Sequence, residues 1–277
     1  MSQLVSPGVT VASLQRLGAL DPVDNRILLC HALGLSRTGL ITQSERALTA
    51  DEAARLSALL QRRLDGEPIA YIVGKREFYG LDFETTPAVL IPRPETELLV
   101  ELALERLPPQ GRVLDMGTGS GAIAVALAHT RPDALVTALD VSPDALAVAQ
   151  RNAAANGVTV RFLHSDWFSA AAGATFDLIV SNPPYIASGD RHLAEGDLRF
   201  EPAGALTDHA DGLSALRRIV SGAPDHLTPV GWLLMEHGYD QSVAVQALLT
   251  TQGYGEVQSW HDLAGIARVT GGRVISA

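Results

Sequence analysis

The chain has 277 residues, of which 47% are hydrophobic, and this is enough for one large and one small globular domain. Its formal net charge of −10 gives no general attraction for phosphate backbones, so we expect no direct nucleic-acid binding. The single cysteine, Cys30, excludes an internal disulfide and favours a reducing compartment.

The first 14 residues lack the basic start and long apolar run of a secretory signal. No segment approaches the ~18 consecutive apolar residues of a membrane span. We therefore expect a soluble, cytoplasmic protein that has no membrane partner and acts as a monomer.

Residues 1–70 have the pattern of a small helical domain, because apolar residues recur at spacings of three and four. Two short helices are predicted from two sets of residues: Leu14, Leu17 and Leu20, then Ile27, Leu28, Leu33 and Leu35. A third helix follows Thr49, which forms a capping-box pattern with Glu52, and ends at Gly66. We expect this domain to recognise a partner, although a purely structural role fits nearly as well.

Residues 71–92 are richer in aromatic and β-branched side chains, and glycines stand at positions 74 and 80. This composition predicts a β-hairpin that links two domains. A helix is then expected to begin near Arg93, because Pro94 suits a first helical turn and Glu95 and Glu97 complement its dipole. The second domain is predicted to occupy residues 93–277.

Strand and helix patterns alternate through this second domain, which is typical of an α/β fold with a parallel sheet covered by helices. The predicted strands are residues 112–116, 135–140, 159–164, 176–181, 231–236, 254–260 and 266–269. The predicted helices are residues 122–128, 143–155, 213–219 and 241–249. The last two strands are expected to add an antiparallel hairpin at the sheet edge. Ligands of such sheets bind at the carboxyl ends of the parallel strands, so the residues after each strand are site candidates.

A glycine-rich turn follows the first of these strands. Its candidate cofactor-binding residues are Asp115, Gly117, Thr118, Gly119, Ser120 and Gly121. The glycines permit positive φ and a close approach of a ligand to the backbone, but dinucleotide sites use a similar turn. Asp115 would repel a pyrophosphate, whereas it suits the cationic amino and sulfonium groups of S-adenosylmethionine. Asp140, which ends the second strand, can accept hydrogen bonds from both ribose hydroxyls. The turn therefore favours S-adenosylmethionine over NAD.

Asp166 and Trp167 follow the third strand. A carboxylate at this edge can accept a hydrogen bond from an adenine amino group while the indole packs on the ring. The alternative is that Asp166 caps a turn and Trp167 belongs to the core.

Asn182, Pro183, Pro184 and Tyr185 follow the fourth strand. The prolines have no backbone N–H and a fixed φ, so this turn offers carbonyl oxygens in a fixed direction. With the Asn182 side-chain oxygen and the Tyr185 ring, the turn can hold a planar group that carries an NH2, such as a carboxamide or a nucleobase amine. A stiff loop without a function is the alternative.

The glycine-rich turn followed by Asn182–Tyr185 resembles the class I methyltransferases that act on amino nitrogens, and more closely the release factor glutamine methyltransferases. Further segments resemble that family: Arg93–Glu97, Ser165–Trp167, Arg199–Pro202, Glu236–Gly238 and Asp262–Arg268. The resemblance covers nearly the whole chain. It implies a Rossmann-like seven-stranded sheet with a small N-terminal helical bundle joined by a β-hairpin.

The resemblance also implies the reaction: methyl transfer from S-adenosyl-L-methionine, with S-adenosyl-L-homocysteine as product, to the side-chain amide N5 of the glutamine in the Gly-Gly-Gln motif of class 1 peptide chain release factors. Asn182, Pro183 and Tyr185 would be catalytic, and Pro184 would join them in substrate binding. Asn182 would also face the cofactor. No metal is expected, because the eight histidines show no metal-ligand spacing.

Four rival functions stay open at this point. An adenine N6 methyltransferase would use the same acceptor pocket. A glutamine methyltransferase of a ribosomal protein would share the catalytic motifs. A protein that senses S-adenosylmethionine without catalysis and a NAD oxidoreductase fit the motifs less well.

Overall fold

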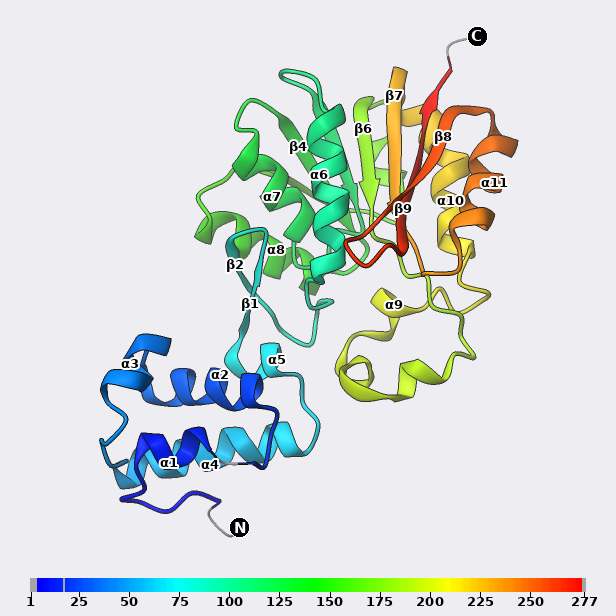
Figure 1. Ribbon diagram of the computed structural model, residues 1–277. Coiled ribbons are helices and arrows are strands. Elements are labelled where there is room, and N and C mark those ends of the chain that lie inside the picture. The colour runs from blue at the N-terminus through cyan, green and yellow to red at the C-terminus, as the bar shows by residue number, and fades with distance from the viewer. Residues whose placement is uncertain (1–3, 17, 276–277) are drawn as a thin grey trace. The chain divides into compact units, whose positions relative to one another are not determined.

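The chain forms two compact units, Met1–Gly74 and Lys75–Ala277. Figure 1 shows the computed structural model, which describes residues 4–16 and 18–275. Leu17, one of the residues from which a first helix was predicted, lies outside the described residues. No helix in the described part of the chain combines the length and apolar composition needed to cross a membrane.

The first unit is helical, as predicted. It contains α1 (Val11–Gln15), α2 (Pro22–Leu33), α3 (Arg37–Thr42), α4 (Ala50–Leu64) and α5 (Ile69–Val73). The predicted capping box is present at the start of α4, where the Thr49 hydroxyl accepts from the Glu52 N–H and the Glu52 carboxylate accepts from the Thr49 N–H. Leu28, Leu40 and Leu56 lie in the buried core of this unit.

The predicted hairpin is shorter than residues 71–92. Its strands are β1 (Lys75–Phe78) and β2 (Leu81–Glu84), which pair in antiparallel fashion. Tyr71 and Ile72, which the sequence suggested for the hairpin, belong instead to α5 and are buried. The helix ends at Gly74, whose φ of 74° is readily adopted only by glycine. Burial of one helical face therefore outweighed the β-branched composition of this segment.

The second unit contains the predicted seven-stranded sheet (Figure 1), in the order β5-β4-β3-β6-β7-β9-β8. Its strands are β3 (Arg112–Met116), β4 (Leu135–Asp140), β5 (Arg161–His164), β6 (Phe176–Ser181), β7 (Leu227–Glu236), β8 (Tyr254–His261) and β9 (Ala267–Val274). Strands β3 to β7 run parallel, and β9 is antiparallel to both β7 and β8. The last strand in sequence thus lies between its two predecessors.

Both faces of the sheet are covered by helices, so its central strands are buried on both sides. The helices of this unit are α6 (Glu97–Arg106), α7 (Ala122–Thr130), α8 (Pro143–Ala155), α9 (Ala203–Leu206), α10 (Ser214–Gly222) and α11 (Ser242–Gln252). Alternate residues of a strand enter opposite cores: Val113 packs in the cluster that includes α6 and α7, and Leu114 packs in the cluster that includes α10 and α11. Figure 1 shows these two pairs of helices on either side of the strands.

Short 3-10 helices occupy the connections. They are η1 (Pro94–Thr96), η2 (Ser169–Ala171), η3 (Arg191–Ala194), η4 (Gly196–Phe200) and η5 (Ala223–His226). Two of them, with α9, lie in the long connection from β6 to α10, for which the sequence predicted only a loop. The η1 turn leads directly into α6, near the predicted helix start at Arg93.

The pairing of β9 with β7 depends on a glycine. A Cβ added at Gly271 would lie 2.5 Å from the Leu233 carbonyl oxygen of the paired strand. We expect Gly271→Ala to lower the free energy of unfolding of the second unit by roughly 1 to 3 kcal/mol, because the strands must move apart. Urea unfolding followed by tryptophan fluorescence measures this, since all three tryptophans lie in that unit. Gly189→Ala is the control, because an added Cβ there meets nothing within 4 Å. Equal stability of the two variants would contradict the prediction.

Candidate active site

A cavity of about 310 Å³ opens at the carboxyl ends of the parallel strands. It brings together residues that are far apart in the sequence, as the topology of a parallel sheet requires. The predicted site residues that line it are Gly117, Thr118, Gly119, Ser120, Asp140, Asp166, Trp167, Asn182, Pro183 and Pro184. Its volume is within the range of small-molecule sites.

Three predicted site residues do not line this cavity. Asp115 is fully buried beneath the glycine-rich turn, and Gly121 forms the left-handed start of α7 with φ 82°. Tyr185 lines a smaller cavity of about 60 Å³, which shares Asn182 and Pro183 with the larger one.

Asp115 supports the glycine-rich turn from below. Its Oδ2 accepts a hydrogen bond of 2.6 Å from the Thr118 hydroxyl, while Oδ1 has no partner among the described residues. Burial raises the pKa of Asp115 to about 7, the Thr118 hydrogen bond opposes this rise, and the Asp140 charge adds to it. Asp115 therefore acts on the cavity through Thr118 and through its charge, without direct contact.

Asp140 is held at the cavity edge by two backbone N–H groups. Oδ2 accepts from the Gly119 N–H and Oδ1 from the Ser142 N–H, each at 2.9 Å. Each carboxylate oxygen keeps a lone pair for another donor. The carboxylate is thus fixed in position and able to accept hydrogen bonds from a diol.

Asp166 and Trp167 form the outer part of the cavity wall. The Asp166 side chain is 68% exposed and lies 3.6 Å from the Arg218 guanidinium. Trp167 has a φ of 52°, which is uncommon for a bulky residue, and the Arg218 guanidinium lies 5.3 Å from its ring centroid. The ring also packs against the hydrophobic cluster of α10 and α11, so Trp167 belongs both to the core and to the cavity wall.

Asn182 stands at the end of β6 with its side-chain amide oriented by a neighbour. Its Nδ2 donates a 3.2 Å hydrogen bond to the hydroxyl of Thr96, at the end of η1. Ser181 Oγ donates to the Met116 carbonyl at 2.8 Å and so ties the end of β6 to the end of β3. The sequence interpretation missed Thr96, since 86 residues separate it from its partner.

Tyr185 points away from the larger cavity toward a buried carboxyl group. Its hydroxyl donates to Glu236 Oε1 at 3.4 Å. Glu236 is 2% exposed, and burial raises its pKa to about 7, against the hydrogen bond from Tyr185 that lowers it. Burial and the Glu236 charge raise the pKa of the Tyr185 hydroxyl, so Tyr185 stays neutral.

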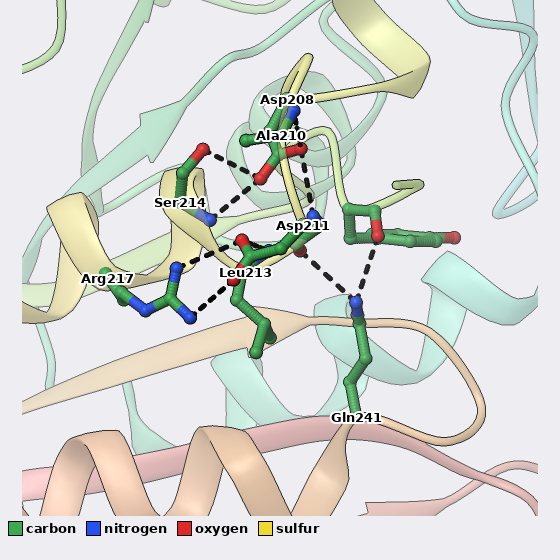
Figure 2. Close-up of polar contacts among 9 residues, drawn as sticks. Asp208, Ala210, Asp211, Leu213, Ser214, Arg217 and Gln241 are labelled. Carbon is green, nitrogen blue, oxygen red and sulfur yellow. Dashed lines mark hydrogen bonds and ion pairs between the residues drawn. The ribbon is translucent and has the colours of Figure 1, made fainter. Parts of the chain in front are cut away.

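The backbone after Tyr185 is held by Gln241, at the start of α11. Gln241 Nε2 donates to the Tyr185 carbonyl at 3.0 Å and to the Gly212 carbonyl at 3.2 Å, while its Oε1 accepts from the Gly238 N–H. Figure 2 shows the two bonds donated by Gln241 Nε2 beside Asp208, whose carboxylate organises the adjacent loop by accepting from four donors. An added Cβ at Gly212 would lie 2.5 Å from the Tyr185 carbonyl oxygen, so the two segments pack closely.

Two further segments without a predicted site role also contribute to the cavity wall. Phe78, Val89, Leu90, Pro92 and Arg93 come from the stretch that was interpreted as a linker or a helix start, and Pro202, Gly204 and Ala205 come from the connection after β6. Arg93 and Glu201 join these segments through an ion pair, and Glu201 Oε2 also accepts from the Ile91 N–H at 3.0 Å. In the described part of the chain, no three His, Cys, Asp or Glu residues are grouped to hold a metal ion.

Comparison with known proteins agrees with this arrangement. A family model described as the methyltransferase small domain matches residues 94–203, and one described as the PrmC N-terminal domain matches residues 12–74. A release factor glutamine methyltransferase of Burkholderia pseudomallei (strain K96243) is 57% identical over 274 residues, which cover 96% of each chain. This chain belongs to the release factor glutamine methyltransferases. It is therefore an enzyme of the methyltransferase class, as its motifs implied.

Other release factor glutamine methyltransferases are nearly as similar. That of Neisseria gonorrhoeae (strain ATCC 700825 / FA 1090) is 51% identical and covers 93% of this chain and 95% of its own. Among solved structures, a methyltransferase from Pyrococcus furiosus is 22% identical, with a TM-score of 0.56 over 79% of this chain and 100% of that one. This structural likeness confirms the class I methyltransferase fold.

The raised pKa of Asp115 predicts a pH dependence of stability. Its pKa rises from an ordinary value of 3.8 to about 7, so folding favours the protonated form. The stabilisation of the folded state by this raised pKa is complete below pH 3.8 and is lost as the pH rises through about 7. We expect the free energy of unfolding of the wild type, relative to Asp115→Asn, to fall by roughly 2 to 3 kcal/mol between about pH 5 and about pH 8. Urea unfolding at both pH values measures this, and a pH-independent difference would contradict it.

Proposed function

We propose that this enzyme, acting as a monomer, transfers the methyl group of S-adenosyl-L-methionine to the N5 amide of the glutamine in the Gly-Gly-Gln motif of class 1 peptide chain release factors. S-adenosyl-L-homocysteine is the second product. One observation carries the proposal: Asn182, Pro183 and Pro184, which belong to a turn rich in hydrogen-bond acceptors, share one cavity with the glycine-rich turn and Asp140. The names of the chain's relatives agree with it. A translation factor as substrate places the reaction in the cytoplasm.

The cavity residues fit S-adenosyl-L-methionine. Gly117 and Gly119 have positive φ, and an added Cβ at either would enter open space, so the turn leaves room for a ligand against its backbone. Asp140 would accept from the ribose hydroxyls, Asp166 from the adenine amino group, and Trp167 would pack on the ring. Thr118, Ser120 and Gly121 would shape the turn, and Asp115 would favour a cationic ligand from below. The cofactor supplies an electrophilic methyl group.

The protein's contribution to the reaction is orientation. An amide nitrogen is a poor nucleophile, because its lone pair is delocalised into the carbonyl group. Asn182 Oδ1 and the Pro183 carbonyl would accept its two N–H hydrogens, aim the lone pair at the methyl carbon and stabilise positive charge as it develops. On methyl transfer, a nitrogen–carbon bond would replace the carbon–sulfur bond of the cofactor, and one N–H proton of the amide would leave to solvent.

The other proposed roles follow from position. Pro184 would stiffen the turn, and the Tyr185 ring would contact the amide plane from the smaller cavity, where Leu90 and Ile186 supply apolar walls. We assign recognition of the release factor to the N-terminal helical unit, Met1–Gly74, in place of the predicted residues 1–70, with the segment from β1 to residue 92 as the linker and residues 93–277 as the catalytic domain. A glutamine presented on an exposed protein loop needs such a recognition surface.

The experiment that tests the substrate incubates the enzyme and labelled S-adenosyl-L-methionine with purified release factors. Parallel reactions contain a release factor whose Gly-Gly-Gln glutamine is replaced by alanine, ribosomal protein, and DNA. We expect label only in the intact release factor, at the N5 position by mass spectrometry. Label in DNA alone would establish the adenine reaction instead, since an exocyclic amine offers the same two N–H donors. Label in ribosomal protein alone would establish a glutamine methyltransferase of a ribosomal protein instead.

Asn182→Ala should reduce turnover of the release factor by more than a hundredfold, because it removes an acceptor that acts mainly in the transition state. The Kd for S-adenosyl-L-methionine should change little. Single-turnover methylation and calorimetry measure the two quantities. Asn156→Ala is the matched control, since Asn156 lies outside the cavity and bonds to Asp82 and Asn152. Methylation by Asn182→Ala at a near wild-type rate would refute this mechanism.

Asp140→Asn should weaken binding of S-adenosyl-L-methionine by roughly 10- to 100-fold, because hydrogen bonds to a charged group contribute roughly 1.5 to 3 kcal/mol. Calorimetric titration measures the Kd. Asp144→Asn serves as a control for the loss of one negative charge nearby, because Asp144 is exposed in the first turn of α8. Equal Kd values of Asp140→Asn and Asp144→Asn for S-adenosyl-L-methionine would show that Asp140 does not bind the cofactor.

A further inference from the structure

Asn152 is a buried polar residue to which the proposed reaction gives no role. It lies on α8, is 1% exposed and does not line either of the two cavities described above. Its side chain bonds to two segments that are distant in the sequence, one at Glu84 and one at Ser120. A buried amide that bonds to two other segments can fix how those segments lie relative to each other.

The first of these segments is the end of the β1–β2 hairpin. Asn152 Oδ1 accepts from the Glu84 N–H at 2.7 Å, and Asn152 Nδ2 donates to the Glu84 carbonyl at 3.1 Å. The side-chain amide thus pairs with the backbone of the last residue of β2. The hairpin and the stretch after it form part of the larger cavity, to which they contribute Phe78 and Leu90. The position of Glu84 therefore bears on one wall of this cavity.

The second segment is the glycine-rich turn. Asn152 Nδ2 donates its other hydrogen to the Ser120 carbonyl at 2.8 Å. Ser120 lines the larger cavity and is 4% exposed. The next residue packs closely on α8, because a Cβ added at Gly121 would lie 3.1 Å from the Ala149 Cβ. The turn thus lies against α8, and Asn152 is its hydrogen-bonding partner there.

The partners of Asn152 allow its side-chain amide only one orientation. The amide has one acceptor oxygen and two N–H donors, and it meets one N–H and two carbonyl oxygens. A flipped amide would place its oxygen against both carbonyl oxygens. A movement of the Ser120 carbonyl must therefore either break its bond to Asn152 or move the amide that also holds Glu84. Through Asn152, the backbone of the turn and the backbone of the hairpin are mechanically connected.

We propose that Asn152 is a positioning residue that couples the glycine-rich turn to the β1–β2 hairpin, so that a ligand bound against the turn also stabilises the end of β2. This inference rests on the proposed function, because it takes S-adenosyl-L-methionine as that ligand. Two other contacts hold the hairpin on α8 and involve no residue of the turn: the Arg151–Glu84 ion pair and a 3.1 Å hydrogen bond from Asn156 Nδ2 to the Asp82 carbonyl. By thermodynamic linkage, the cofactor must stabilise the hairpin contact as much as that contact stabilises the bound cofactor.

Substitution of Asn152 separates this role from a purely structural one. Asn152→Ala should raise the Kd for S-adenosyl-L-methionine roughly tenfold, because the Ser120 carbonyl loses the bond that fixes it. Asn156→Ala is the matched control, since it removes a bond between α8 and the hairpin only, and its Kd should stay within about threefold of the wild type. Thr270→Val removes a buried hydroxyl from β9, so it should lower stability and leave the Kd unchanged. Calorimetric titration measures the Kd, and urea unfolding measures stability.

Hydrogen exchange of the wild type tests the coupling without any substitution. Glu84 does not line the larger cavity, so a ligand bound there does not contact its N–H directly. We expect saturating S-adenosyl-L-methionine to slow exchange of the Glu84 N–H roughly fivefold or more, because Asn152 then holds it more firmly. The Gln110 N–H is the matched control, since it also donates to a side chain, that of Asp133 at 2.8 Å, outside the cavity. Its exchange rate should not change.

The outcomes separate the two proposals. If the wild type does not bind S-adenosyl-L-methionine, the proposed function fails, and the ligand-free protein still tests the connection. In that protein the NMR signal of the Gly121 N–H, which shares a peptide group with the Ser120 carbonyl, should shift in Asn152→Ala and not in Asn156→Ala. An unshifted Gly121 signal in Asn152→Ala would overturn the inference, as would a Glu84 exchange rate that does not respond to bound cofactor. A Kd of Asn152→Ala equal to that of Asn156→Ala would do the same. Should Asn152→Ala not fold, hydrogen exchange of the wild type decides.

Discussion

The parallel pairing of β3, β4, β5 and β6 is the constraint on which the site depends. Parallel strands end at the same edge of a sheet, so the residues after each strand meet there even though they are far apart in sequence. The glycine-rich turn follows β3, and Asp140 ends β4, which pairs with β3 on one side. Asn182 follows β6, which pairs with β3 on the other side. Backbone hydrogen bonding between the strands thereby brings together the residues that are proposed to bind the methyl donor and the methyl acceptor.

The side chains at this edge are held by groups that lie behind them. Thr96 orients Asn182, Gln241 holds the Tyr185 carbonyl, and Thr118 connects Asp115 to the glycine-rich turn. Two of the supporting groups, Asp115 and Glu236, are buried carboxyl groups whose raised pKa values reflect poor solvation. Buried carboxyl groups of this kind lower the stability of the fold. Such a loss is a common consequence of holding polar groups in the fixed directions that a reaction needs.

The sequence predicted the sheet well, because buried parallel strands are continuous apolar runs with clear ends. Strands β3, β4 and β6 have the predicted bounds, and so does α8. The hairpin was predicted too long, since a β-branched stretch can equally form a helix when one face is buried, as in α5. The residues after each strand were found from their position, whereas Thr96 was missed and Glu236 received no role. Contacts across 86 residues and the burial of a carboxyl group have no local signature in a sequence.

The place of β9 in the sheet has a consequence for how the enzyme forms during synthesis. Strand β7 carries Glu236 at its end, and that residue pairs with Val269 of the last strand. The sheet cannot acquire its final order until β9 has left the ribosome and inserted between β7 and β8. A nascent chain that stops at β8 therefore has the sequence motifs of the site. It lacks β9, the strand that pairs with the buried residue Glu236. We therefore expect the enzyme to gain its activity only after β9 has been synthesised and has inserted between β7 and β8.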